Sequence, residues 1–165
     1  MIEAELFNVD QFAWVKNPRS VAIGTNVTGI GDFAFENCTN LTSITIANSV
    51  TSIVDQAFAY CNFMNVTIPA SVTNIGYHAF YGNAVTSITI PSSVISIGES
   101  AFSSCSGLSN ITINNGVTSI GEFAFCDCSN LMSITIPASV TSVGNSAFYD
   151  CTGLTSITVL GKTTA

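Results

Sequence analysis

Residues 117–139 read VTSIGEFAFCDCSNLMSITIPAS, and five other stretches of the chain are recognisable copies of this segment. Successive copies start 22 or 23 residues apart. A fixed period in this range predicts a solenoid, in which each copy forms one turn and neighbouring turns bury a continuous apolar core. The six copies begin at Val27, Val50, Val72, Val94, Val117 and Val140.

Two columns of side chains are expected to build that core. Every copy has Ala-Phe at its eighth and ninth positions, and five copies have Cys at the twelfth, where the third copy has Asn83. Equivalent atoms of adjacent turns should lie about 5 Å apart, so neighbouring cysteines form a disulfide only if their side chains turn toward each other. Identical inward columns favour buried free thiols instead. The proposed structural ladder contains Ala34, Phe35, Ala57, Phe58, Ala79, Phe80, Ala101, Phe102, Ala124, Phe125, Ala147, Phe148, Cys38, Cys61, Cys105, Cys128 and Cys151.

Each copy also contains a predicted strand. In the first copy, residues 41–46 read LTSITI, and alternation points Leu41, Ile44 and Ile46 into the core. Because these segments recur once per turn, they should pair in parallel. The counterparts are residues 63–68, 85–90, 108–113, 131–136 and 154–159.

The candidate ligand-binding surface is the outward face of these strands, where the two residues that flank each inner position form two columns of small polar groups. One interpretation is that Thr is simply a good strand former whose hydroxyl group keeps the outer face of an uncharged sheet hydrated. The other is a hydrogen-bonding array for a ligand, and the sequence leaves both open. The residues are Ser43, Thr45, Asn65, Thr67, Ser87, Thr89, Asn110, Thr112, Ser133, Thr135, Ser156 and Thr158.

The segment before Ala-Phe is expected to turn and start a short helical turn. Five copies place Gly at one position, which suggests a backbone angle that suits Gly, although Val54 occupies it in the second copy. The next residue is usually acidic or Asn, and such residues are favoured at a helix start. We therefore interpret this second column as helix caps. The two columns are Gly31, Gly76, Gly98, Gly121 and Gly144, followed by Asp32, Asp55, Glu99, Glu122 and Asn145.

Residues 1–26 depart from the repeat and are interpreted as a degenerate N-terminal capping turn. Counting back from Val27 puts Phe12 at the Phe position and Val21 and Ile23 at strand positions. Terminal repeats need an atypical outer face that shields the open core. The apolar side of this cap would come from Leu6, Phe7, Phe12 and Trp14. Residues 27–160 hold the six repeats, and residues 161–165 form a C-terminal tail.

Charge excludes two classes of partner. The net charge is −7, and the chain has no Lys or Arg from Ser20 to Gly161. Nucleic-acid backbones and anionic lipid surfaces are bound mainly through clustered cations. No apolar run reaches the roughly 20 residues of a membrane span, and the first twenty residues lack a signal-peptide pattern. We expect a soluble chain that neither binds nucleic acid nor inserts into membranes, while a cytoplasmic location or a fragment of a longer protein stays open.

No catalytic or metal constellation is recognisable. The only histidine is His78, and each acidic residue has a turn or cap to explain it. Cys126 lies outside the cysteine column and is expected to be partly exposed, but Cys-Asp-Cys lacks the four ligands of a structural zinc site. We therefore predict no catalytic residue, no metal ligand and no cofactor.

The recurring pattern SVTSIG..AF..CSNL.SITIP, which covers residues 27–159, resembles the BspA-like class of leucine-rich repeats. The resemblance implies a curved, right-handed solenoid of the α/β leucine-rich type, with a parallel strand sheet on the concave face and short extended or helical turns on the convex face. It also implies an extracellular or cell-surface adhesion or protein-binding module, with a host extracellular or surface protein as partner. No catalytic residue is implied by it.

Two alternative functions remain. The thinly capped C-terminal end would allow turns of different copies to stack, giving a structural module that self-associates. The regular Thr column is also similar to the ice-binding faces of some repeat proteins, although leucine-rich sheets curve whereas an ice plane is flat.

Overall fold

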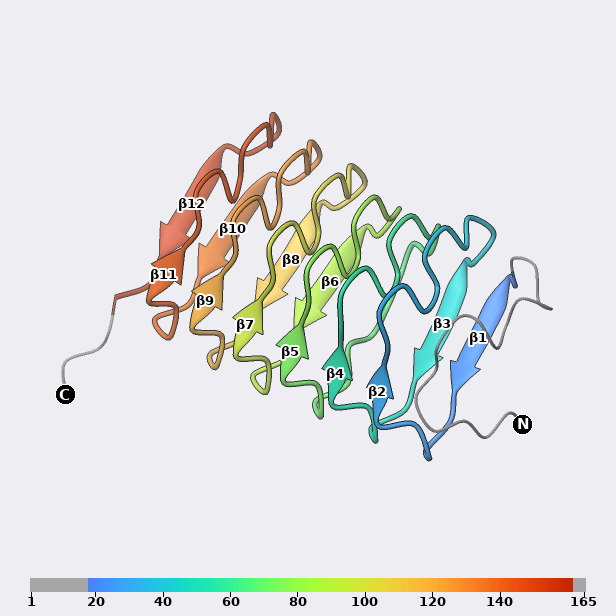
Figure 1. The fold of residues 1–165 in the computed structure, drawn as a ribbon. Coiled ribbons are helices and arrows are strands. Elements are labelled where there is room, and N and C mark those ends of the chain that lie inside the picture. Colours follow the sequence, from blue (N-terminus) through green and yellow to red (C-terminus); the bar gives the residue numbers. More distant parts are fainter. Residues whose placement is uncertain (1–17, 162–165) are drawn as a thin grey trace.

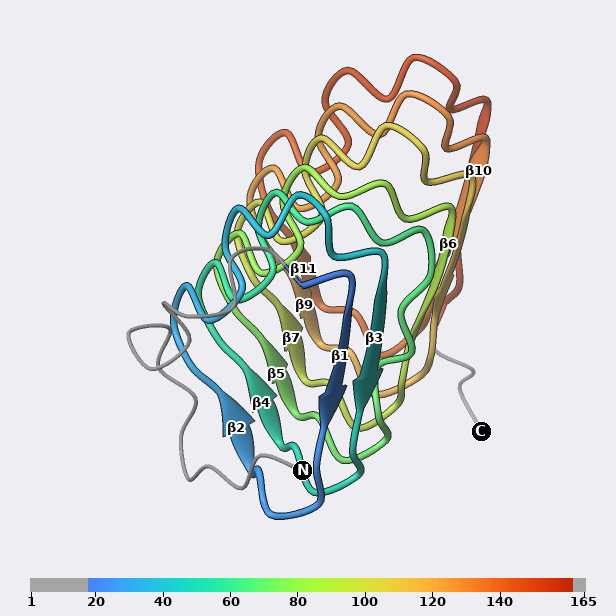
Figure 2. The same ribbon diagram turned by 90° about the vertical axis from the view of Figure 1, so that its right-hand side faces the viewer.

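The computed structural model describes residues 18–161, which form a parallel β-solenoid with one turn for each copy of the repeat (Figure 1). Two strands in each regular turn pair with the equivalent strands of neighbouring turns, and all pairs are parallel. Figure 2 shows the longer and the shorter strands on opposite walls of the solenoid. The repeat period therefore predicts the architecture correctly.

The longer strands contain four residues each and form the face that carries the candidate ligand-binding residues. Hydrogen bonds join them in three pairs, β1 with β3, β6 with β8 and β10 with β12. In each pair the inward Ile or Val residues are in register, as in Val21 opposite Ile44 and Ile23 opposite Ile46. These strands are β1 (Ser20–Ile23), β3 (Ser43–Ile46), β6 (Ser87–Ile90), β8 (Asn110–Ile113), β10 (Ser133–Ile136) and β12 (Ser156–Val159).

The shorter strands form a continuous six-stranded parallel sheet on the opposite wall. Each strand but the last, where Val143 is exposed, buries one apolar residue, and Ile53 and Ile75 are fully buried there. The strands are β2 (Gly29–Ile30), β4 (Ser52–Ile53), β5 (Asn74–Ile75), β7 (Ser96–Ile97), β9 (Ser119–Ile120) and β11 (Ser142–Val143).

The Ala-Phe segments form hydrogen-bonded turns, and residues 18–161 contain no helix. Residues on both sides of Ala-Phe have positive φ, for example Phe33 at 59° and Asn37 at 58°. Every second N–H of this segment donates to the next turn, as where the Phe35 N–H donates to the Ala57 carbonyl at 2.8 Å. The expected helical turn is therefore wrong, because bonds between turns replace bonds along a helix. Without a helix, this part of the chain has no helical membrane span.

Two members of the acidic column cap the neighbouring turn rather than a helix. The Asp55 carboxylate accepts a hydrogen bond from the Tyr77 N–H at 2.9 Å, and the Asp32 carboxylate accepts one from the Asp55 N–H at 3.2 Å. Each of these two carboxylates thus pairs with a backbone group one turn further along the solenoid. The sequence correctly predicts that these carboxylates accept hydrogen bonds from backbone N–H groups. Those N–H groups belong to the next turn, however, and not to the start of a helix.

A column of phenylalanine rings occupies the core beneath the turns. Neighbouring rings are stacked with centroids 5.1 to 5.6 Å apart, from Phe35 to Phe148. Offset stacking of this kind adds a favourable contact to the burial of apolar area. The preceding alanine is buried in every copy and leaves room for the ring beside it.

The glycine column is explained by close approach and not by a special backbone angle. None of its members has positive φ. A Cβ atom built at Gly98 would lie 2.5 Å from the carbonyl carbon and oxygen of Gly76, and one at Gly121 would lie 2.6 Å from Gly98. Neighbouring turns therefore touch backbone to backbone at this position.

Replacing Gly98 with Ala tests this explanation. Gly98→Ala should lower the free energy of unfolding by about 1–3 kcal/mol, because the new methyl group forces adjacent backbones apart. Chemical denaturation followed by circular dichroism measures the loss. Gly24→Ala is the matched control, since a Cβ there meets nothing within 4 Å. Equal stability of the two variants would contradict the close-approach explanation.

Candidate functional site

The residues predicted for the ligand-binding face all project into solvent. Each of the twelve is exposed, while the inward residues between them are buried or half-buried in every turn but the last. Ten of them lie on the longer strands, and Asn65 and Thr67 lie on a segment without regular strand structure. The structure therefore brings the predicted polar columns together on one wall.

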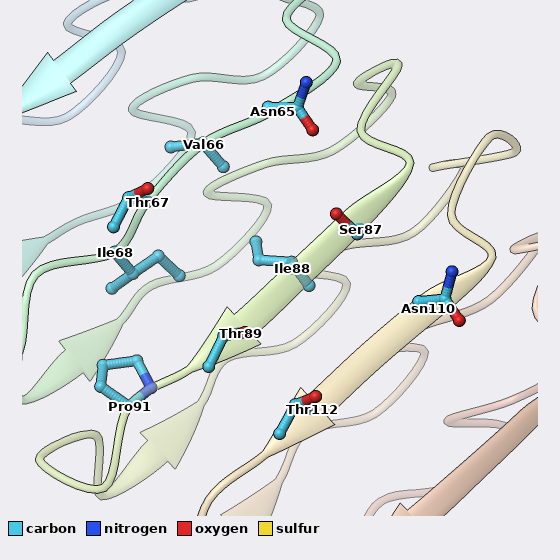
Figure 3. Close-up of a pocket in the computed structure, with 10 residues that line it drawn as sticks. All are labelled: Asn65, Val66, Thr67, Ile68, Ser87, Ile88, Thr89, Pro91, Asn110 and Thr112. Carbon is cyan, nitrogen blue, oxygen red and sulfur yellow. The ribbon is translucent and has the colours of Figure 1, made fainter.

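A hollow of about 360 Å³ interrupts this wall near the second and third copies. Figure 3 shows Ser87, Thr89 and Thr112 projecting from β6 and β8 along one side of it. The segment that replaces a strand in the second copy forms the other side. The lining residues are Asn65, Val66, Thr67, Ile68, Ser87, Ile88, Thr89, Pro91, Asn110 and Thr112.

The hollow lies where the strand ladder is broken. Residues 63–68 occupy a strand position, yet a single bridge between Asn65 and Ser87 is their only described strand pairing. This copy has one residue fewer between its cysteine and its strand position, and it buries Phe63 where the first copy has Leu41. The Phe63 ring packs edge-on against Phe58 and Phe80, at 5.8 and 6.2 Å. The third copy has an equally short loop, from Asn83 to Val85, and still forms the regular strand β6, so the larger Phe63 ring is the feature that sets this segment apart.

The lining of the hollow is uncharged. Its polar groups are amides and hydroxyls, which both donate and accept hydrogen bonds. Such a lining suits a neutral polar surface, such as an extended peptide backbone, better than a compact ion. The break also makes the wall uneven, which disfavours a flat surface that matches an ice plane.

The cysteine column is buried and hydrogen-bonded. The Cys128 thiol donates to the Phe102 carbonyl at 3.3 Å, and Cys151 donates to Phe125 at 3.0 Å. Burial raises the pKa of Cys105 to about 12 and raises that of Cys128 as well. A high pKa keeps the proton on sulfur, which these S–H donors require. All five members are free thiols, and four are buried, whereas Cys38 is half-buried.

Cys126 is also buried, with 8% of its surface exposed, so the expectation of partial exposure is wrong. Its thiol donates to the Asp127 carboxylate at 3.3 Å, and burial raises its pKa to about 11. Within residues 18–161, no three His, Cys, Asp or Glu side chains are grouped as metal ligands would be.

Asn83 takes the place of a cysteine, but only part of its side-chain amide is hydrogen-bonded. Its side-chain Nδ2 donates to the Phe58 carbonyl at 2.7 Å and to the Phe80 carbonyl at 3.1 Å. Its Oδ1 is buried without a hydrogen-bond partner. A buried acceptor without a partner costs about 1–3 kcal/mol.

Sequence reasoning missed two further features. A serine precedes the first Val of four copies and bonds to the previous turn, as where the Ser71 hydroxyl donates to the Val50 carbonyl at 2.6 Å. Its signal was the recurrence of Ser at the last position of four copies. A group of aromatic rings around His78 also forms on the turns, where the sequence showed only scattered tyrosines.

A family model described as the BspA type leucine-rich repeat region (6 copies) matches residues 6–85 and 73–165. The chain therefore belongs to the BspA-type leucine-rich repeat family, as the recurring motif indicates. None of the curated protein sequences compared with the chain matches it.

Solved structures share the fold. The pneumococcal vaccine antigen PcpA is 25% identical with a TM-score of 0.77, over 88% of this chain and 41% of that one. A leucine-rich repeat protein from Bacteroides ovatus is 24% identical with a TM-score of 0.59, over 88% and 62%. One from Bacteroides capillosus is 36% identical with a TM-score of 0.51, over 61% and 75%. The chain thus spans less than two thirds of the length of the first two.

Replacing Asn83 with Cys should restore the cysteine column and stabilise the protein. The new thiol would donate to the Phe58 carbonyl, and the buried Oδ1 would be gone, so the free energy of unfolding should rise by about 1 kcal/mol. Chemical denaturation under reducing conditions measures it. Asn83→Ala serves as control and should be destabilising, because it also removes the donor. An Asn83→Cys variant no more stable than the parent would contradict the prediction.

Proposed function

We propose that this chain is a non-enzymatic protein-binding module of a cell-surface adhesion protein, and that its ligand contacts the wall formed by the longer strands. The observation that carries the proposal is the uncharged hollow at the broken strand ladder. It offers hydrogen-bonding side chains beside strand positions that lack regular pairing partners.

A partner that lays an extended segment into the hollow would supply the missing pairing. Main-chain hydrogen bonds would then give affinity, and the side chains of the wall would give specificity. Ser87 and Asn110 lie opposite each other in the β6–β8 pair and form part of one side. Asn65 bridges to Ser87 from the other side.

Family membership supports the same class of function. Leucine-rich repeats are scaffolds whose surfaces bind partners, and a structural neighbour is described as a vaccine antigen. That description favours a surface location for this chain and a host extracellular protein as its partner. The absence of a charged group from the lining of the hollow fits binding better than acid–base catalysis.

The experiment is a binding screen with matched variants. Immobilised protein is presented to a panel of purified host extracellular proteins, and saturable binding is measured by surface plasmon resonance. Asn110→Lys places a long cation in the hollow and should weaken such binding roughly tenfold or more. Asn130→Lys makes the same substitution at an exposed position outside the hollow and should change affinity less than about twofold.

Two results would count against the proposal. If neither Asn110→Lys nor Thr89→Lys lowers the affinity, the strand wall is not the ligand site. Failure of every panel protein to bind would remove the support for adhesion.

A second candidate function is self-association through the C-terminal end. In β12 all four residues are exposed, and Val159 is 71% exposed whereas Ile136, its partner in β10, is 4% exposed. No turn within the described residues covers this end of the core. A second copy stacked on it would bury Ile157, Val159 and Leu160.

Replacing Val159 with Asp tests the stacking. Light scattering over a concentration series should show association of the parent chain, and Val159→Asp should abolish it because a carboxylate would enter the apolar contact. Thr158→Asp adds the same charge on the outward side of β12 and should leave association intact. A parent chain that is monomeric at every concentration would exclude this function.

A further inference from the structure

Four aromatic rings form a continuous surface on the turns of the second and third copies. The Tyr77 and His78 rings stack with centroids 3.8 Å apart, and the His78 and Tyr81 rings stack at 4.6 Å. The Tyr60 ring meets Tyr81 edge-on at 5.1 Å. Tyr60 is 46% exposed and Tyr77 is 40% exposed, so the group, here called the aromatic patch, faces solvent.

The backbone is shaped to hold this group. Gly82 has a φ of 66°, and a Cβ atom there would lie 3.0 Å from Cδ1 of Tyr60. The Tyr60 ring therefore lies over a turn that has no side chain at this point. Tyr60 itself holds the equivalent position in the second copy, and the other copies have Asn37, Ser104, Asp127 and Asp150 there. The packing of Tyr60 thus depends on a local departure from the repeat.

Carboxylates surround the patch. Glu99 and Asp55 act electrostatically on His78, and Glu36 acts on Tyr60. The Asp55 carboxylate is held in place by the Tyr77 N–H at 2.9 Å. Since the chain has no Lys or Arg from Ser20 to Gly161, no cation of these repeats is available to neutralise them.

His78 adds a ring rather than a positive charge. Burial lowers the pKa of His78 below its ordinary value, although Glu99 and Asp55 act in the opposite direction. The imidazole is therefore neutral at pH 7.5, about one unit above the ordinary pKa of His. A neutral ring between two tyrosines does not repel a cation.

We propose that the aromatic patch binds an arginine or lysine side chain of a basic partner protein. The cation would lie over the exposed Tyr60 and Tyr77 faces, while Asp55 and Glu99 supply the opposite charge. Arginine suits this geometry best, because its planar guanidinium stacks on aromatic rings and pairs with carboxylates. The patch lies on the turns, separate from the strand wall, so this inference does not depend on the proposed function.

The single histidine makes the test direct. Its ring proton signals are unique in the NMR spectrum, and they can be followed as an oligoarginine peptide is added at about pH 7.5. Saturable shifts are expected, and a neutral oligoglutamine peptide should give none. Tyr60→Leu and Tyr77→Leu keep apolar area but remove the cation–π contact, and each should weaken binding about two- to five-fold.

Matched controls separate the patch from the general negative charge of the protein. Tyr149→Leu alters an exposed tyrosine at the position equivalent to Tyr81 in the last copy and should leave affinity unchanged. Glu99→Gln should weaken binding more than Glu122→Gln, although each removes one charge from the same column. Circular dichroism verifies the fold of every variant.

The proposal is overturned if Tyr60→Leu and Tyr77→Leu bind the peptide as tightly as Tyr149→Leu does. Equal effects of the two glutamate variants would also overturn it, since binding would then reflect net charge alone. An equal response to the oligoglutamine peptide would assign the patch to a neutral ligand instead.

Discussion

Close contact between identical turns is the constraint on which the structure depends. Parallel backbone pairing sets the distance between turns at about 4.8 Å, and the glycine column lets the backbones approach at a point where a Cβ would collide. At that spacing each Phe meets the equivalent Phe of the next turn, so the rings stack along the whole core. The side chains that bond between turns, such as Cys128 and Ser71, work at the same spacing.

This constraint also determines where the molecule is free to vary. Core and turn-contact positions must repeat, because a change in one turn is felt by both neighbours. Exposed positions contact no neighbouring turn in this way, so their residues can differ from copy to copy. The hollow beside residues 63–68 and the aromatic patch around His78 are two surface features at which copies depart from the pattern, and they lie on different faces of neighbouring turns. A scaffold of uniform turns can thus present two chemically distinct surfaces, one neutral and one aromatic and acidic.

The repeat family and the buried positions could largely be predicted from the sequence, whereas the hydrogen bonding of the turns could not. The Ala-Phe and Cys columns and the inward Ile residues follow from period and alternation, since both depend only on which positions recur. The expected helical turn failed because propensity describes bonds within a segment, and here the Phe35 N–H bonds to the next turn. The glycine interpretation failed for a related reason: the space at Gly98 is taken by Gly76, which belongs to another turn.

The sequence by itself determined the number and length of the turns, the inward columns, the outward polar columns and the family, because each follows from residues that recur along one chain. Only the tertiary structure decided where the strand ladder breaks, that Cys126 is buried, and that Tyr60, Tyr77, His78 and Tyr81 form one surface. The physical reason is the same in each case. These features depend on the distance and orientation between side chains of different turns, which a pattern of recurrence within one chain does not specify.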